Sequence, residues 1–212
     1  MTFLPETPTL VAYLGACLVL FVTPGPDMSL MLARTIAAGR RAGIATLLGT
    51  STGTLGHTLA AAFGISALLA ASATAFLVLK VVGALYLAWL AIDALRHGSA
   101  LSVRPEARVT GGIWRTYWKG VGVNLTNPKV VLFFITFLPQ FVRADSPNPA
   151  GQLAFLGATF VALSLPLGLL LVLGAERITG SLQARPRVLR AMDWLFAGMF
   201  GAFAARILAT AR

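Results

Sequence analysis

The sequence predicts an all-α integral membrane protein with six transmembrane helices, arranged as two inverted three-helix repeats. Composition indicates a membrane protein: 57% of the 212 residues are hydrophobic and only 11% are charged, whereas about 25% of the residues in a soluble domain are charged. Prolines interrupt two of the apolar runs, so we expect the first and fourth helices to be broken. Similar interruptions in the two halves of the chain predict the repeats.

The net charge of +10 does not indicate a nucleic-acid partner. The basic residues form short clusters between apolar runs, without a basic face or interleaved aromatic residues, so we expect no nucleic-acid binding. The single cysteine, Cys17, lies inside an apolar run, which excludes a disulfide framework and a cysteine metal site. No cofactor motif is present, and we predict neither a cofactor nor a bound metal.

Six apolar runs are long enough to cross a bilayer, which takes about 20 residues in a helix. They cover approximately residues 9–33, 43–65, 72–95, 116–141, 151–175 and 188–208. The first run is preceded by Glu6 rather than by Lys or Arg, and it is longer than the apolar core of a signal peptide. We therefore expect it to stay in the mature protein, with membrane lipid around the chain.

Arginine and lysine residues concentrate in the first, third and fifth linkers between these runs. The second linker is uncharged, and the fourth carries only Arg143 with Asp145. By the positive-inside rule the three basic linkers face the cytoplasm, which places both termini outside. Little charge flanks the first run, so the sequence leaves open whether that run crosses the membrane fully.

The first run is interrupted by the five consecutive residues Thr23, Pro24, Gly25, Pro26 and Asp27. The two prolines remove backbone donors and restrict the residues before them, so a continuous helix is not expected here. In a bilayer, non-helical backbone and a charged side chain are tolerated only inside protein or beside a water-filled cavity. This interruption is therefore a candidate functional site.

The second run combines glycines with polar residues. We expect Gly49, Gly53 and Gly56 to permit close helix packing. The polar residues recur at helical spacing and are Thr46, Thr50, Thr54 and His57. They either line a polar path or, more simply, hydrogen-bond to their own helix and its neighbours. His57 is also a candidate for proton coupling, because histidine titrates near neutral pH; its alternative role is packing.

The fourth run is interrupted after Thr126 by Asn127, Pro128 and Lys129, in a pattern similar to the first. The third and sixth runs also match: each opens with leucine followed by a basic residue and closes with an arginine at the same spacing. With three spans per half, the halves have opposite orientations in the membrane. We expect one transporter domain, residues 1–212, consisting of repeat 1 (about 9–98), a cytoplasmic linker (about 99–112) and repeat 2 (about 113–208).

Paired breaks near the membrane midplane offer complementary groups to a zwitterion. Each following half-helix has free N–H groups, and each preceding one has free carbonyls. Asp27 at a helix amino end is favoured by the helix dipole, whereas Lys129 in the equivalent place needs an anionic partner. In the functional interpretation, that partner is Asp27, a substrate carboxylate, or both in alternation. In the structural interpretation, Asp27 and Lys129 form a static pair that holds the two halves together.

The predicted substrate-binding residues are Thr23, Pro24, Gly25, Pro26, Asp27, Asn124, Asn127, Pro128 and Lys129. Asn124 and Asn127 can both donate and accept hydrogen bonds near the second break. Asn127 has an equally simple role in satisfying the backbone groups beside Pro128. Asp27 is the first candidate for proton coupling, provided that proton and ammonium bind to it in mutual exclusion.

The segments around both breaks resemble the LysE family of bacterial amino-acid exporters, and more closely its homoserine/threonine exporter (RhtB) branch. The resemblance covers nearly the whole chain and rests on Phe21-Val22-Thr23-Pro24-Gly25-Pro26-Asp27, Gly39-Arg40-Arg41-Ala42-Gly43, Gly83-Ala84-Leu85-Tyr86-Leu87, Val123-Asn124-Leu125-Thr126-Asn127-Pro128-Lys129 and Leu138-Pro139-Gln140-Phe141. It implies a multi-pass protein of the bacterial inner membrane that exports amino acids or close derivatives, driven by the proton gradient. It favours neutral or hydroxylated substrates such as homoserine or threonine.

Two other classes of function fit the sequence less well. A membrane enzyme needs a nucleophile or a cluster of metal ligands, and the chain has no such pattern and only two histidines. A metal-ion exporter on the same scaffold is disfavoured by the single cysteine and the scattered histidines. A homo-oligomer is compatible with a chain of this size, but no motif defines an interface.

Overall fold

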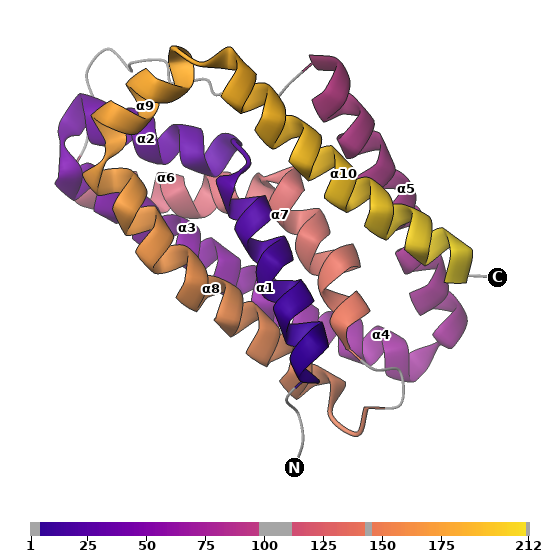
Figure 1. The fold of residues 1–212 in the computed structure, drawn as a ribbon. Helices are drawn as coiled ribbons and strands as arrows, with labels where there is room; N and C mark the ends of the chain where they lie inside the picture. The colour runs from indigo at the N-terminus through magenta and orange to yellow at the C-terminus, as the bar shows by residue number, and fades with distance from the viewer. Residues whose placement is uncertain (1–4, 98–111, 143–145, 211–212) are drawn as a thin grey trace.

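A computed structural model describes residues 5–97, 112–142 and 146–210, and every regular element in these ranges is helical (Figure 1). Nearly all of the predicted cytoplasmic linker, including Arg104 and Arg108, lies outside the described residues. Arg143 and Asp145, expected in the fourth linker, also lie outside them.

Within the described ranges, three helices are long and apolar enough to cross a membrane. They are α5 (Ala73–His97), α8 (Pro149–Leu173) and α10 (Pro186–Thr210), which correspond to the predicted third, fifth and sixth runs. Two bent pairs of helices bring the count to five if each pair forms one span. The chain is therefore a helical integral membrane protein.

The first bent pair consists of α1 (Thr7–Val22) and α2 (Pro26–Ala38), which meet at 51°. The second consists of α6 (Ile113–Thr126) and the helical stretch that begins with α7 (Pro128–Leu132), which meet at 52°. Both bends fall where the sequence predicts an interruption. Each following helix begins at a proline, whose missing N–H is not needed at that position.

The predicted second run, residues 43–65, corresponds to α3 (Arg40–Ala60) and the π-helix η1 (Ala61–Ile65), followed by α4 (Ser66–Ala71). It is not among the helices of sufficient length and apolarity. The reason is compositional, because α3 opens with two arginines and continues with many glycines and hydroxyl residues that face other helices. Six spans in two inverted repeats therefore remain a prediction.

Close packing of α3 on α6 organises one end of the bundle, and α3 makes its most extensive contacts with this helix. A Cβ added at Gly49 would overlap the backbone carbonyl of Tyr117, and one added at Gly120 would lie 2.7 Å from the carbonyl oxygen of Thr46. Only glycine permits this approach. Gly53 has the same role against Asn124, whereas Gly56 makes an ordinary contact.

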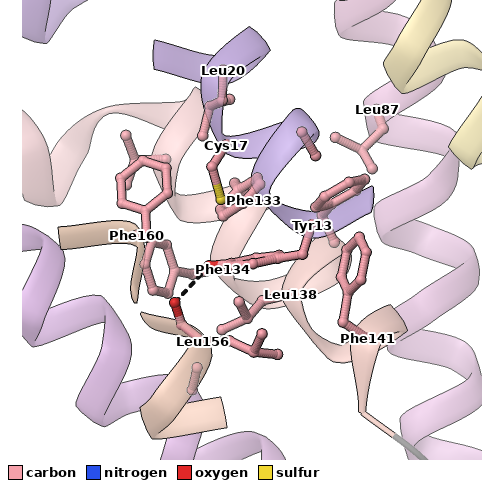
Figure 2. Packing of buried hydrophobic residues seen from close by; sticks show 14 of the residues in the cluster. Tyr13, Cys17, Leu20, Leu87, Phe133, Phe134, Leu138, Phe141, Leu156 and Phe160 are labelled. Carbon is pink, nitrogen blue, oxygen red and sulfur yellow. Dashed lines mark hydrogen bonds between the residues drawn. The ribbon is translucent and has the colours of Figure 1, made fainter. Parts of the chain in front are cut away.

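An aromatic core lies between α1, α8 and the segment that follows α7 (Figure 2). That segment continues as the π-helix η2 (Phe133–Phe137) and the 3₁₀-helix η3 (Leu138–Phe141). Its aromatic residues are Tyr13, Phe133, Phe134, Phe137, Phe141 and Phe160, together with Phe196 and Phe200 of α10. The Tyr13 hydroxyl, fully buried, donates a hydrogen bond of 2.7 Å to the carbonyl of Leu156, so α1 is fixed to α8.

Two of the predicted basic linkers lie within the described residues, at the junction of α2 with α3 and around Arg177. In Figure 1 the junction of α2 with α3 and the short helix α9 (Ala175–Gln183) lie toward one end of the bundle, and the amino terminus, α4 and the carboxyl terminus lie toward the other. The remaining basic linker lies mostly outside the described residues, so the placement of both termini on the side opposite the basic linkers stays a prediction. The sequence did not predict α9 as a helix.

Candidate functional site

The first break lies between α1 and α2, and it leaves the amino end of α2 without a side-chain cap. Thr23 turns back on α1, since its N–H and its hydroxyl both donate to the carbonyl of Val19, at 3.0 and 2.7 Å. Gly25 is fully extended, and no side chain caps the amino end of α2. Asp27 stands in the first turn of α2, where the helix dipole favours a carboxylate.

The second break, between α6 and α7, is satisfied by its own residues. The side-chain oxygen of Asn127 accepts a hydrogen bond of 3.1 Å from the backbone N–H of Lys129 and so caps α7. The backbone N–H of Asn127 donates to the carbonyl of Asn124 at 3.1 Å. The backbone role considered for Asn127 is therefore present in the structure.

Two side chains of the second break also reach across the space between the breaks and contact the first. The Asn124 amide donates a hydrogen bond of 2.6 Å from Nδ2 to Oδ2 of Asp27. The Lys129 ammonium donates a bond of 2.6 Å from Nζ to the backbone carbonyl of Thr23. No direct Asp27–Lys129 ion pair occurs among the contacts of the described residues, and Oδ1 of Asp27 is buried without a hydrogen-bond partner. The two charges thus face the same space with different partners.

Asn124 connects three elements around this space. Its side chain is 2% exposed, and its Oδ1 lies 3.4 Å from the hydroxyl of Thr54 on α3. Its backbone carbonyl lies 3.2 Å from Nε2 of His57, whose ring stacks on Phe134 with centroids 5.7 Å apart. His57 therefore touches the residue that holds Asp27, but it does not itself line the pocket described next.

A pocket of about 60 Å³ lies between the two breaks, enough for a few water-sized groups. Six of the nine predicted binding residues line it: Thr23, Gly25, Asp27, Asn124, Asn127 and Lys129. The other three are prolines, and their part is to end or begin helices. Pro24 is buried, whereas Pro26 and Pro128 are exposed.

The pocket also includes polar residues outside the nine predicted binding residues. Thr50 and Thr54 line it while their hydroxyls bond to carbonyls of their own helix, as the simpler interpretation of α3 predicted. Ser51 and Ser164 were missed. One feature of the sequence could have indicated Ser164. It lies two residues before Pro166, which has no backbone N–H to donate within α8.

Apolar side chains complete the lining. Met28, Met31 and Phe160 face the pocket beside the polar residues, and all three are buried. Asp193 on α10 is a further buried charge, 2% exposed, that the sequence analysis passed over although it lies inside the predicted sixth run. Across the described residues, no three His, Cys, Asp or Glu side chains gather as a metal site would require.

Comparison with known proteins gives a family and several relatives. The profile of a family described as LysE type translocator matches residues 18–211. The chain is 31% identical over 201 residues to the homoserine/homoserine lactone efflux protein of Salmonella typhimurium strain LT2, covering 95% of this chain and 96% of the relative. It is 26% identical over 204 residues to the leucine efflux protein of Klebsiella pneumoniae, covering 93% of each.

An uncharacterized membrane protein of Escherichia coli K12, YahN, is 26% identical over 195 residues, covering 92% of this chain and 86% of that protein. No solved structure matches the chain. The matches extend over both breaks and the helices that carry the pocket.

Proposed function

The chain belongs to the LysE family of translocators, and from that premise we propose that it exports amino acids or close derivatives through the pocket between its two helix breaks. Family members are efflux proteins rather than enzymes, and this one is a multi-pass protein of the bacterial inner membrane. Its substrate is therefore a small molecule. The class of substrate, the binding site and the coupling ion are the parts that we propose.

The observation that carries the proposal is the state of Asp27. Its Oδ1 is buried and has no hydrogen-bond partner, although a buried carboxylate oxygen without a partner costs free energy. It also lies in a pocket that residues of both breaks line. An ammonium group placed against Oδ1 would remove this cost, so the pocket is suited to an amino group.

The remaining groups of an amino acid have partners in the same pocket. The uncapped amino end of α2 offers N–H groups to a carboxylate, and the Lys129 ammonium can turn its further donors toward it. Met28, Met31 and Phe160 provide an apolar surface for the side chain. The small volume and the hydroxyl residues beside it favour neutral or hydroxylated amino acids such as homoserine or threonine, in keeping with the efflux relatives.

Alternating access provides the transport step. In this proposal the chain forms two inverted repeats, about 9–98 and 113–208, that rock against each other around the pocket. The similar bends of 51° and 52° support the repeats. The close α3–α6 contact at Gly49 and Gly120 parts to open the pocket toward the basic linkers, and the aromatic core around Tyr13 loosens to open it on the other side.

Proton binding at Asp27 couples export to the proton gradient. A proton and a substrate ammonium compete for the same carboxylate, which is the requirement for exchange. His57 is the second candidate, since it touches the backbone of Asn124 and Asn124 in turn holds Asp27.

Counterflow in proteoliposomes tests this function. Proteoliposomes that contain the purified protein and are loaded with unlabelled homoserine, threonine or leucine are expected to take up the labelled substrate in exchange. An imposed pH gradient is expected to drive net export. The Asp27→Asn variant is expected to lose both. Exchange that ignores the pH gradient and uncouplers would remove the coupling claim, and full transport by a folded Asp27→Asn protein would remove the proposed site.

A further inference from the structure

The ammonium group of Lys129 lies at the first break, although the residue belongs to the second. The residue belongs to the second break, at the start of α7, but its Nζ lies 2.6 Å from the carbonyl oxygen of Thr23 at the first. A Cβ added at Gly25 would be 3.4 Å from the same Nζ, so the ammonium rests against bare backbone. The ring of Phe196 on α10 lies 5.8 Å away.

These three neighbours form a site for a cation. The carbonyl of Thr23 stands at the carboxyl end of α1, which is the negative end of that helix dipole. The face of an aromatic ring within about 6 Å adds attraction for a positive charge. A glycine at position 25 leaves room for the charged group to approach the chain.

The pocket therefore contains two places for a positive charge. One is the carbonyl end of α1, already occupied by Lys129. The other is the free Oδ1 of Asp27. Since the two lie in one pocket, a ligand that carried two ammonium groups would need both.

We propose that Lys129 determines the charge class of the substrate, by filling the second cation subsite so that only amino acids with a single ammonium group are exported. This inference rests on the proposed function of the pocket. Lys129 acts here as a built-in replacement for a substrate side-chain ammonium. Asp27 and Lys129 together leave the pocket neutral, which matches a zwitterion and repels a substrate with a net positive charge.

Removing the lysine charge should change the substrate class rather than only weaken transport. In Lys129→Met the carbonyl of Thr23 and the ring of Phe196 become available, and the pocket gains a net negative charge. A diamino acid can then place its backbone ammonium at Asp27 and its side-chain ammonium at the carbonyl end of α1. In Lys129→Arg the guanidinium still fills the subsite, so the specificity should stay as in the wild type.

The test compares counterflow of homoserine with that of 2,4-diaminobutyrate, ornithine and lysine. Four proteins are reconstituted: wild type, Lys129→Met, Lys129→Arg, and the control Lys119→Met, which removes an exposed lysine of α6 outside the pocket. We expect the ratio of diamino-acid to homoserine transport to rise at least about ten-fold in Lys129→Met, and to stay unchanged in the other two variants. Lys129→Ala serves if Lys129→Met does not purify as a folded protein.

The outcomes separate this inference from the proposed function. If the wild type exchanges homoserine and folded Lys129→Met or Lys129→Ala shows the wild-type ratio, the charge-class inference is wrong and the exporter remains. The same holds if Lys129→Arg gains diamino-acid transport. If the wild type exchanges no amino acid at all, both the inference and the proposed function are overturned.

Discussion

The two helix breaks bend the chain by nearly the same angle, yet they treat their polar groups in opposite ways. At the second break Asn127 caps α7 and satisfies a backbone N–H. At the first break nothing caps α2, and a buried carboxylate oxygen of Asp27 has no partner. A proline begins the helix that follows each break, but only the first break leaves a buried polar atom without a partner among the described residues. In the proposed mechanism the first break holds the substrate ammonium, and the second break supplies Asn124 and Lys129 across the pocket.

The contacts across the pocket follow the same division. Two side chains of the second break donate hydrogen bonds of 2.6 Å to the first. Asn124 donates to Oδ2 of Asp27, and Lys129 donates to the carbonyl of Thr23. Among the described residues, no side chain of the first break hydrogen-bonds to a backbone group of the second. A change of Asp27 at the first break should therefore affect transport most, whereas a change of the cap residue Asn127 at the second break should affect stability more.

The largest effect is expected from Asp27→Asn. The amide keeps an oxygen that can accept from Asn124, so folding should survive, but the charge that attracts an ammonium is lost. We expect transport to fall about 100-fold, the loss typical of removing a charged hydrogen-bond partner. Initial rates of homoserine counterflow measure it, with Glu176→Gln, exposed on α9, as the control. A fall of less than about three-fold would contradict the assignment of Asp27 to binding.

A smaller but broader effect is expected from Asn124→Ala. The change removes the bond to Asp27 and the contact with Thr54, and it leaves a cavity beside Gly53. Both stability and transport should decrease, the stability by about 1–3 kcal/mol. Thermal unfolding in detergent and counterflow measure the two effects. Loss of transport at unchanged melting temperature would mean that Asn124 binds substrate directly instead of holding Asp27.

Asn127→Ala tests the supporting role of the second break. Loss of an N-cap costs about 1 kcal/mol in stability, while the contacts that Asn124 and Lys129 make with the first break do not depend on the Asn127 side chain. Transport should therefore stay within about five-fold of the wild type. If Asn127→Ala abolishes counterflow in a protein that unfolds at the wild-type temperature, the second break takes part in binding, and the contrast between the breaks is wrong.

The smallest effect is expected from His57→Gln. Glutamine can replace the contact of Nε2 with the carbonyl of Asn124, and His57 does not line the pocket. Transport and its response to a pH gradient should stay within about two-fold of the wild type. A variant that keeps counterflow but no longer responds to the pH gradient would assign the coupling to His57 rather than to Asp27.

The sequence was sufficient where a local rule decides the structure. Pro24, Pro26 and Pro128 predict both bends, because a proline interrupts a helix whatever surrounds it. Gly49 predicts the close approach of α3 to another helix, although not that the partner is α6. The hydroxyls of Thr50 and Thr54 bond within their own helix, as isolated threonines in membrane helices commonly do.

The sequence was insufficient where distant segments meet. It placed Lys129 near an anion, but the carbonyl of Thr23 that the lysine binds is separated from it by 106 positions in the chain. Ser51 and Ser164 line the pocket only because α3 and α8 pack around it, and hydropathy gives no sign of that. The predicted second run does not meet the apolar criterion, because the glycines and hydroxyl residues of α3 pack on other helices.

A thermodynamic cycle that combines one change in the protein with one change in the ligand tests directly whether Asp27 binds the substrate ammonium. One change is Asp27→Asn in the protein, and the other replaces threonine by its analogue without the amino group. The affinity of both ligands is measured on purified wild type and variant. If Asp27 binds the ammonium, loss of the amino group weakens binding to the wild type at least about ten-fold and to the variant less than about two-fold. An equal loss in both proteins would contradict it.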